Sequence, residues 1–404
     1  MRRYGHGSAA PVRSSLWVLI YVQLLSASST DISLQANLTM PSEEVRAAVF
    51  SSSGTVVYVC TQTTTSGLGE LFAVDVSVPT APIVVGVVEH SDLRSGRAML
   101  LAADGGHVYV ASNGIDGIVA VDLSSTEAPQ VVGTVTSSAT LRRPEALALA
   151  PLDASLVLVA AWESDAFTIV DVATPSHPAV HSSISDATML QGAAGVAATG
   201  SRAYVSSFGG DHIVVIDITD AAAPTIVGSL DDTRLNGARG VAIAAMHMGV
   251  VVVACTLRSA LVVLNVSIDS QPEVLAEYRD VDTDGGLGLT RKAWAVAVEG
   301  SRVYMTARTS DTLLVFSLST PSEPVLVGSH GGGLGGAQAL GVTSSRQLAV
   351  VGGSPTTTET NPSRAADSRL LSILSLQRSP SPPPPAPPLP SPPPPSTPPP
   401  SPPP

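Results

Sequence analysis

The sequence predicts an all-β fold in which one structural unit is repeated, and three observations lead to it. A mostly apolar phrase recurs six times at intervals of about 50 residues, ends in aspartate in four of its copies, and is followed by a proline-containing turn and usually a Val-Val-Gly-like stretch. Short alternating apolar stretches, separated by Gly, Pro, Ser and Asp, fill the chain between these phrases. Aromatic residues are only 4% of the chain, so Val, Ile, Leu and Ala must form the core. Strand repeats of this length indicate a propeller or a solenoid.

One repeat contains the signals for four strands. In the fourth repeat, residues 195–199, 203–207, 213–217 and 225–229 are apolar or alternating. Gly-Ser-Arg, Gly-Gly-Asp-His and a proline-containing segment separate them, and these are turn sequences. Four short antiparallel strands of this kind make one propeller blade.

The repeated phrase is clearest at Leu71–Gly86, which reads LFAVDVSVPTAPIVVG. It resembles the LVIVD repeat, a β-propeller repeat found in many secreted and surface proteins. The resemblance extends over roughly residues 32–378 and departs from the pattern where Asn265 and Ser317 replace the aspartate. It implies a fold and, by itself, no reaction.

The last repeat is incomplete, and this predicts how the ring closes. Residues 340–343, 348–352 and 370–376 supply three strands, but no Pro-x-Val-Val-Gly strand follows. Residues 32–39 form a strand at the other end that belongs to no unit. We therefore expect residues 31–378 to form a seven-bladed β-propeller of four-stranded antiparallel blades, closed by the N-terminal strand in the last blade. An open solenoid, which would leave strand edges exposed, is the alternative.

Both ends of the chain are typical of a secreted protein. Residues 1–29 have a basic start, an apolar run of about 10 residues and a small-residue end, as in a signal peptide. A retained signal anchor is the alternative. Residues 379–404 are almost only Pro and Ser and predict an extended polyproline II tail. Their Ser-Pro-Pro-Pro-Pro blocks resemble hydroxyproline-rich cell-wall glycoproteins, which implies hydroxylated, O-glycosylated prolines; a plain linker is the alternative.

Composition limits the classes of partner. Asn37 and Asn265 are in N-glycosylation sequons. The two cysteines, Cys60 and Cys255, fall in different repeats and are expected to be unpaired. Loss of three arginines with the signal peptide would take the net charge from −12 to −15, which argues against nucleic-acid binding. No later segment is long and apolar enough to predict a transmembrane span.

Basic residues concentrate in the short links that precede the inner strand of each blade. These links meet on one face of a propeller, around its channel. Guanidinium groups there would suit carboxylates, sulfates or phosphates. The predicted anion-binding residues at the channel mouth are Arg46, Arg97, Arg143, Arg239, Lys292 and Gln338. An alignment of the links matches Arg46, Arg97 and Gln338 with Arg143, Gly192, Gly237 and Lys292.

Acids expected on the same face offer the alternative that the arginines only form structural ion pairs. These acids include Asp116, Glu163, Asp165, Asp211 and Asp311. Trp162 and Trp294 also map near this face, where they would either stack on a sugar ring or pack between blades.

No linear motif of catalysis is present, so the sequence predicts no catalytic residue, cofactor or metal ligand. The preferred interpretation is a monomeric extracellular module. Its propeller face would bind an anionic glycan or a protein, and its tail would associate with cell wall or matrix. The main alternative is an enzyme with its site in the channel, hydrolase- or lactonase-like, acting with or without a metal ion. A passive spacer is the third.

Overall fold

The structure of the protein is a computed structural model. It describes residues 30–378, apart from 41–43, 63–66, 281–286, 335, 344, 346 and 354–369. The predicted signal peptide, residues 1–29, and the predicted proline-rich tail, residues 379–404, lie outside these described residues. One compact unit spans Ser29–Gln377.

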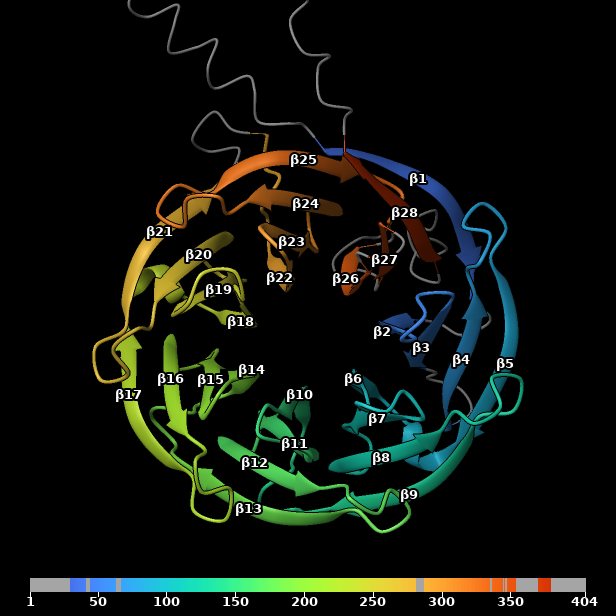
Figure 1. Ribbon diagram of the computed structural model, residues 1–404, viewed down its shortest axis with the longest axis horizontal. Helices are drawn as coiled ribbons and strands as arrows, with labels where there is room; N and C mark the ends of the chain where they lie inside the picture. Colours follow the sequence, from blue (N-terminus) through green and yellow to red (C-terminus); the bar gives the residue numbers. More distant parts are fainter. Residues whose placement is uncertain are drawn as a thin grey trace, which may run out of the picture. The chain divides into compact units, whose positions relative to one another are not determined.

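This unit consists of seven sheets of four strands, arranged as blades around a central axis (Figure 1). In blades 1 to 6 the strands follow chain order from the axis outward. Blades 1 to 3 comprise β2 (Glu44–Phe50), β3 (Val56–Gln62), β4 (Gly69–Asp75) and β5 (Ile83–His90); β6 (Gly96–Leu101), β7 (His107–Ser112), β8 (Gly117–Asp122) and β9 (Gln130–Thr136); and β10 (Pro144–Ala150), β11 (Asp153–Ala161), β12 (Ala166–Asp171) and β13 (Ala179–Ser185).

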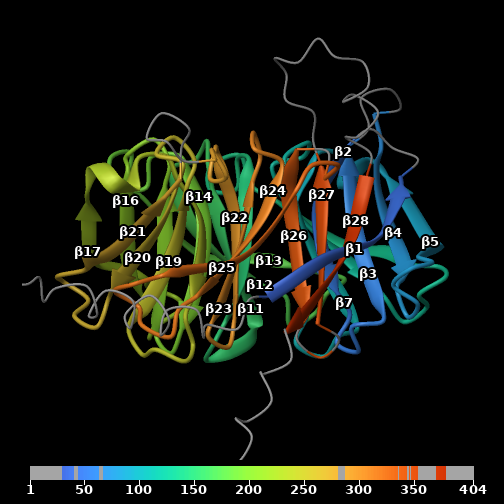
Figure 2. The same ribbon diagram turned by 90° about the horizontal axis from the view of Figure 1, so that it is seen from above.

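Blades 4 to 6 repeat the same pattern. They comprise β14 (Ala193–Thr199), β15 (Arg202–Ser207), β16 (His212–Asp217) and β17 (Thr225–Asp231); β18 (Ala238–Ile243), β19 (Val250–Cys255), β20 (Ala260–Asn265) and β21 (Glu273–Arg279); and β22 (Ala293–Glu299), β23 (Arg302–Ala307), β24 (Thr312–Ser317) and β25 (Val325–Gly331). In the side view the strands run between two faces of the ring, and the links gather on these faces (Figure 2).

Blade 7 joins the two ends of the propeller. It contains β26 (Ala337–Thr343), β27 (Leu348–Gly353), β28 (Leu370–Arg378) and, outermost, β1 (Thr30–Thr39). Across the outer pair, Ser372 Oγ donates a 2.8 Å hydrogen bond to Asn37 Oδ1. The predicted closure by the N-terminal strand is therefore confirmed, and the solenoid alternative is excluded.

The repeat aspartate fixes the turn that follows the third strand. Its Oδ1 atom accepts a hydrogen bond of 2.7–2.9 Å from the backbone N–H two residues later, at Asp75, Asp122, Asp171 and Asp217. Asn265 Oδ1 and Ser317 Oγ accept the equivalent bonds at 3.1 and 3.4 Å. This position therefore requires a short side chain with an acceptor oxygen, rather than a negative charge.

The repeat glycine lets the next blade approach the fourth strand. A Cβ atom at Gly86, Gly133 or Gly228 would lie within 2.1 Å of a backbone oxygen in the following blade. In blade 3, where Ser182 takes this position, its Oγ donates a 2.5 Å hydrogen bond to the carbonyl of Ala221 in blade 4. The phrase is thus conserved from blade to blade because it forms a turn and an inter-blade contact.

Aliphatic side chains fill the interfaces between blades. Each of seven clusters of buried side chains in the described residues combines two neighbouring blades. Between blades 3 and 4, for example, Phe167 and Ile169 pack with Val205 and Val214.

The cysteines belong to this core. As predicted, Cys60 on β3 and Cys255 on β19 are buried and form no disulfide. Burial raises the pKa of the Cys60 thiol to about 12. In the described part of the chain, no helix has the length and apolar character needed to cross a membrane.

Candidate functional site

The seven inner strands line a cavity of about 260 Å³ on the axis of the propeller. Each strand contributes three consecutive residues to its wall. The second residue of every triplet is alanine or glycine, and the third is apolar. The first residues, which we call the mouth ring, are Arg46, Arg97, Glu145, Ala194, Arg239, Trp294 and Gln338.

A β-bulge positions every residue of the mouth ring at the start of its inner strand. The register with the second strand shifts across this residue, for example between Val45 and Ala47 and between Gly96 and Ala98. The same shift occurs in the other five blades, and in β22 it includes both Trp294 and Ala295. Because a bulge re-aims a side chain, these seven residues can turn to the axis.

The residue two positions before the mouth ring has a left-handed backbone in blades 2 to 7. Its φ lies between 53° and 82° at Ser95, Arg143, Gly192, Gly237, Lys292 and Gly336. The alignment of the links was therefore out of register, because it matched four of these residues with Arg46, Arg97 and Gln338. Non-glycine residues rarely adopt this conformation, so the residue types of Arg143 and Lys292 do not predict it.

The predicted anion-binding residues consequently divide into three groups. Arg46, Arg97, Arg239 and Gln338 belong to the mouth ring. Arg143 lines an adjoining cavity of about 380 Å³, whose wall also includes Arg46 and Arg97. Lys292 is exposed and is absent from the walls of both cavities.

Acids in the links between the second and third strands of a blade, which we call the middle links, clamp the next blade. Asp116, Asp165 and Asp211 each accept a backbone hydrogen bond from the left-handed residue of the following blade, at 3.0, 2.7 and 2.8 Å. Asp311 accepts the same kind of bond from Gly336 at 2.6 Å. In these blades, side-chain oxygens of the preceding blade therefore fix the backbone just before the inner strand, and this positions the mouth-ring residue that follows.

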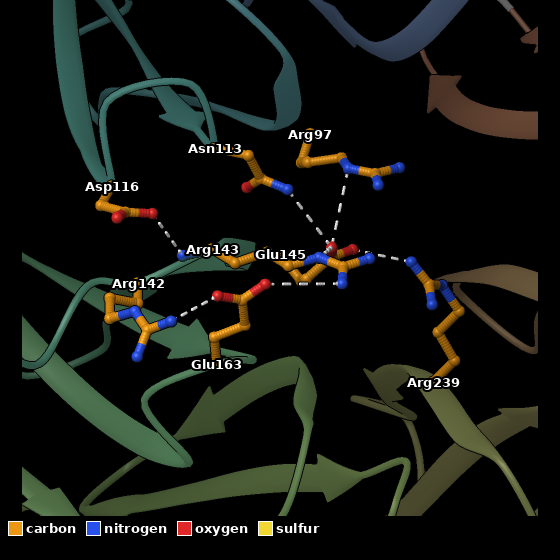
Figure 3. Close-up of polar contacts among 8 residues, drawn as sticks. All are labelled: Arg97, Asn113, Asp116, Arg142, Arg143, Glu145, Glu163 and Arg239. Atoms are coloured by element: carbon orange, nitrogen blue, oxygen red, sulfur yellow. Dashed lines mark hydrogen bonds and ion pairs between the residues drawn. The ribbon is translucent and has the colours of Figure 1, made fainter. Parts of the chain in front are cut away.

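Glu145 lies at the centre of an arginine cluster (Figure 3). Its side chain is 2% exposed, and its Oε2 accepts from Arg239 Nη2 at 2.7 Å. Its Oε1 accepts from Arg143 Nε at 3.1 Å and lies 3.6 Å from Arg97 Nε. Burial alone would raise the pKa of Glu145, but attraction by Arg239, Arg97 and Arg143 outweighs burial and lowers it. Glu145 therefore remains an anion inside the protein.

Asn113 completes this cluster. In the orientation drawn in Figure 3, its amide nitrogen donates to Glu145 Oε1 at 3.4 Å. With the amide turned over, its nitrogen donates to Pro144 O at 2.7 Å and its oxygen accepts from Arg97 Nε at 3.1 Å. We adopt the second orientation because it satisfies both ends of the amide.

Glu163 forms a second, more exposed pair at the same mouth. It accepts from Arg142 Nη2 at 2.8 Å and lies 3.9 Å from Arg143 Nη1. The ion-pair alternative thus describes Arg143 and Arg239 well, since both are held by carboxylates of the protein.

Trp162 and Trp294 both contact arginines. The Arg239 guanidinium lies 3.8 Å from the ring centre of Trp294 and 5.8 Å from that of Trp162. Arg143 also lies over Trp162, at 5.1 Å, while Phe208 packs against the same ring at 4.9 Å. Cation–π contact thus supports the guanidinium groups that surround Glu145.

Arg46 and Gln338 differ from the rest of the mouth ring. Arg46 Nη2 forms an ion pair with Glu44, but Arg46 Nε is buried without a partner among the described residues. Burial, and repulsion by Arg97, lower the pKa of Arg46 to about 10, so it is charged at neutral pH. Gln338 is 4% exposed, and its Oε1 likewise has no partner in the described part of the chain.

Sequence reasoning missed Glu145, Ala194 and Trp294 as members of the mouth ring. The two-residue offset between Ser95 and Arg97, repeated between Gly336 and Gln338, is visible only in the backbone conformation, so no signal in the sequence identified these residues. Among the described residues, no group of three His, Cys, Asp or Glu side chains could hold a metal ion.

Comparisons with solved structures give the same architecture. The WD40 repeats of RRP9 align with a TM-score of 0.65 at 12% identity, covering 87% of this chain and 99% of that chain. A protein from Lactobacillus plantarum aligns at 0.59 with 14% identity, covering 72% and 86%. A protein of unknown function from Desulfotomaculum acetoxidans DSM 771 aligns at 0.56 with 12% identity, covering 70% and 86%. At these identities the likeness shows the fold alone.

Sequence comparison identifies the repeat itself. None of the curated proteins matches the chain. The LVIVD repeat matches residues 57–90, 95–137, 157–186, 192–232 and 290–330. The repeat with Asn265 falls outside these matches, although it folds into the same four strands. The protein is therefore a seven-bladed β-propeller, five segments of which match the LVIVD repeat.

Proposed function

We propose that the protein is a secreted binding module whose channel mouth binds a carboxylate-bearing partner, either an anionic glycan or an acidic protein segment. Its proline-rich tail associates with cell wall or matrix. A propeller of LVIVD repeats with a polar mouth above a wall of small apolar residues suits a binding role.

The pair Arg46 and Arg97 carries this proposal. Their guanidinium groups lie close enough to repel each other, and burial adds to the lowering of the Arg46 pKa. Among the described residues, Arg97 contacts Glu145 and Asn113 through Nε. An incoming carboxylate would relieve the repulsion and accept charge-assisted hydrogen bonds, which are stronger than neutral ones.

The extracellular setting is supported by separate observations. The chain begins with a signal-like segment and ends in Ser-Pro-Pro-Pro-Pro blocks. Asn37 of the first sequon is exposed on β1, the outermost strand of blade 7. Asn265 of the second sequon donates from Nδ2 to Glu273 Oε1 at 2.9 Å, so we propose Asn37 as the better glycan acceptor.

Binding of the full chain to acidic and neutral polysaccharides, at low and high salt, tests this function. We expect binding to acidic polymers that weakens with salt, because the attraction is ionic. An Arg46→Ala/Arg97→Ala variant should lose this binding at least about tenfold, since each charge-assisted bond is worth about 1.5–3 kcal/mol.

Arg234→Ala is the matched control, because Arg234 pairs with its neighbour Asp232 outside both cavity walls. It should bind like the original protein. Equal binding of neutral polymers, or equal losses in both variants, would contradict an anion site at the mouth.

A further inference from the structure

The channel cavity has room for a small molecule or a single residue of a polymer, and the adjoining cavity of about 380 Å³ leaves space beside it for the rest of a polymer. Its volume is about 260 Å³, just below the range of about 300–1,000 Å³ that takes drug-sized ligands. Alanine and glycine follow the mouth ring on every strand, so the wall below the mouth offers shape and no charge. A single sugar-sized ring matches this space better than an extended chain does.

The charges of the mouth favour a ligand with one negative charge. Glu44, Glu145 and Glu163 already neutralise much of the local positive charge. Within the described part of the chain, what remains is Arg46 Nε, which is buried without a partner, and the terminal nitrogens of Arg97, which point away from Glu145 in Figure 3. These donors match the two oxygens of one carboxylate, whereas a phosphate dianion would meet repulsion from the three glutamates.

Gln338 requires a hydrogen-bond donor from the ligand, whereas the arginines require an acceptor. Its Oε1 is a buried acceptor without a partner in the described residues, and Gln338 lines the same cavity as Arg46 and Arg97. An unsatisfied buried acceptor costs free energy unless a donor reaches it. A carboxylate cannot donate, so the ligand must also carry a hydroxyl or a similar donor.

From these three features we infer that the mouth ring binds one small hydroxy-carboxylate of sugar size, of the hexuronic acid class. Its carboxylate lies on Arg46 and Arg97, and one of its hydroxyls donates to Gln338 Oε1. This inference rests on the proposed function of the same mouth and adds the ligand class. The acid is either free or one residue of an acidic polysaccharide, because both present the same groups.

Calorimetric titration of the full chain with D-glucuronate, D-glucose and propionate tests the inference. Glucose has the hydroxyls without the carboxylate, and propionate has the carboxylate without hydroxyls. We expect glucuronate to bind at least about tenfold more tightly than propionate, since a buried hydrogen bond to an otherwise unpaired acceptor is lost with propionate. Glucose should show no binding.

Two variants separate the two halves of the site. Gln338→Met keeps the side-chain length and removes the acceptor, so it should bring glucuronate down to the affinity of propionate and leave propionate unchanged. Arg46→Met should abolish binding of both acids, while Arg234→Met, outside the mouth, should change neither. Equal affinity for glucuronate and propionate, or an equal loss of both in Gln338→Met, would overturn the role of Gln338.

A second titration, with an oligogalacturonide, tells whether the acid binds free or as part of a polymer. It also separates failure of the ligand class from failure of the anion-binding function. Displacement of the bound oligomer by free glucuronate supports a single-residue site. If the oligomer binds with salt dependence but excess glucuronate does not displace it, the inference fails and the anion-binding function stands. If neither oligomer nor monomer binds, both fail.

Discussion

At the scale of single residues, the same side-chain chemistry serves two separate purposes in this propeller. Carboxylates of the repeat and of the middle links accept backbone N–H groups and so build turns and clamps. Glu145 is different, because it is buried among three arginines whose positive charge it partly offsets. The role of an acid near the channel therefore follows from its hydrogen-bond partners and not from its position in the repeat.

Replacing Glu145 with the isosteric glutamine should strongly destabilise the protein. Glu145→Gln leaves three partly buried guanidinium groups without their anion, and breaking a buried ion pair on one side costs about 3–5 kcal/mol. Denaturant unfolding at neutral pH measures this loss. An unfolding free energy within about 0.5 kcal/mol of the original, the usual range for a surface substitution, would show that the cluster contributes little.

The contribution of Glu145 should also depend on pH. Its folded pKa is lowered from the ordinary value of 4.5, so its stabilisation is present above that value and is lost as the pH falls through the folded pKa. Unfolding curves between neutral pH and pH 3, a range chosen around the ordinary carboxyl pKa, should therefore converge for the original protein and Glu145→Gln. A gap that stays constant over this range would contradict the assignment.

At the scale of elements, the links between blades are held by side chains of the preceding blade. Asp211 accepts from the backbone of Gly237 at 2.8 Å and from the amide of Asn236 at 2.8 Å. Asp116, Asp165 and Asp311 act in the same way. This arrangement explains how links that differ in sequence still put a mouth-ring residue at the same position, the start of the inner strand.

Removing one clamp should loosen its own link first. Asp211→Ala leaves the Gly237 N–H without its acceptor, which costs about 1–3 kcal/mol for a buried group. Hydrogen exchange at Gly237 should accelerate more than exchange in the core of β16. Asp231→Ala, an exposed position at the end of β17, is the control and should leave both rates unchanged. Uniform acceleration throughout blade 4 would contradict a local clamp.

The packing of blades predicts a second effect at this scale. A Cβ at Gly228 would lie 1.8 Å from the Asp269 carbonyl oxygen of blade 5, whereas at Gly106 it would meet only a side-chain atom at 3.5 Å. Gly228→Ala should therefore cost about 1–3 kcal/mol or more through overpacking. Gly106→Ala should be almost neutral. Thermal unfolding of both variants checks this, and similar melting temperatures would exclude the close approach as the reason for glycine.

The sequence was sufficient for the strands because period, turn residues and repeat spacing all agree for them. It was not sufficient for the mouth ring. Arg143 and Lys292 occupy a left-handed position that gives no signal in their residue type, so the alignment lost its register by two residues. The pairing of Arg239 with Glu145, which are 94 positions apart, depends on the closed ring and has no local trace in the sequence.

At the scale of the whole molecule, closure of the ring joins the two ends of the propeller in blade 7. The prediction succeeded because an unassigned strand at one end and a missing strand at the other are complementary. Without β1, the outer edge of β28 would be open to pairing with another chain.

Deletion of residues 30–39 should therefore lower the melting temperature and cause concentration-dependent association. A synthetic peptide of residues 30–39 should reverse both effects by adding the missing strand. Light scattering and thermal unfolding follow the two properties. A deleted chain that stays monomeric, with its melting temperature unchanged, would show that closure by β1 is dispensable.

Binding of a carboxylate at the channel mouth depends, in both proposals, on Arg46 and Arg97. The most direct measurement is a titration of the full chain with D-glucuronate, observed through the NMR signals of the arginine Nε–H groups. We predict saturable shifts of the Arg46 and Arg97 signals, with no shift at Arg234. Binding that leaves the Arg46 and Arg97 signals unmoved, or that moves the Arg234 signal instead, would contradict the claim.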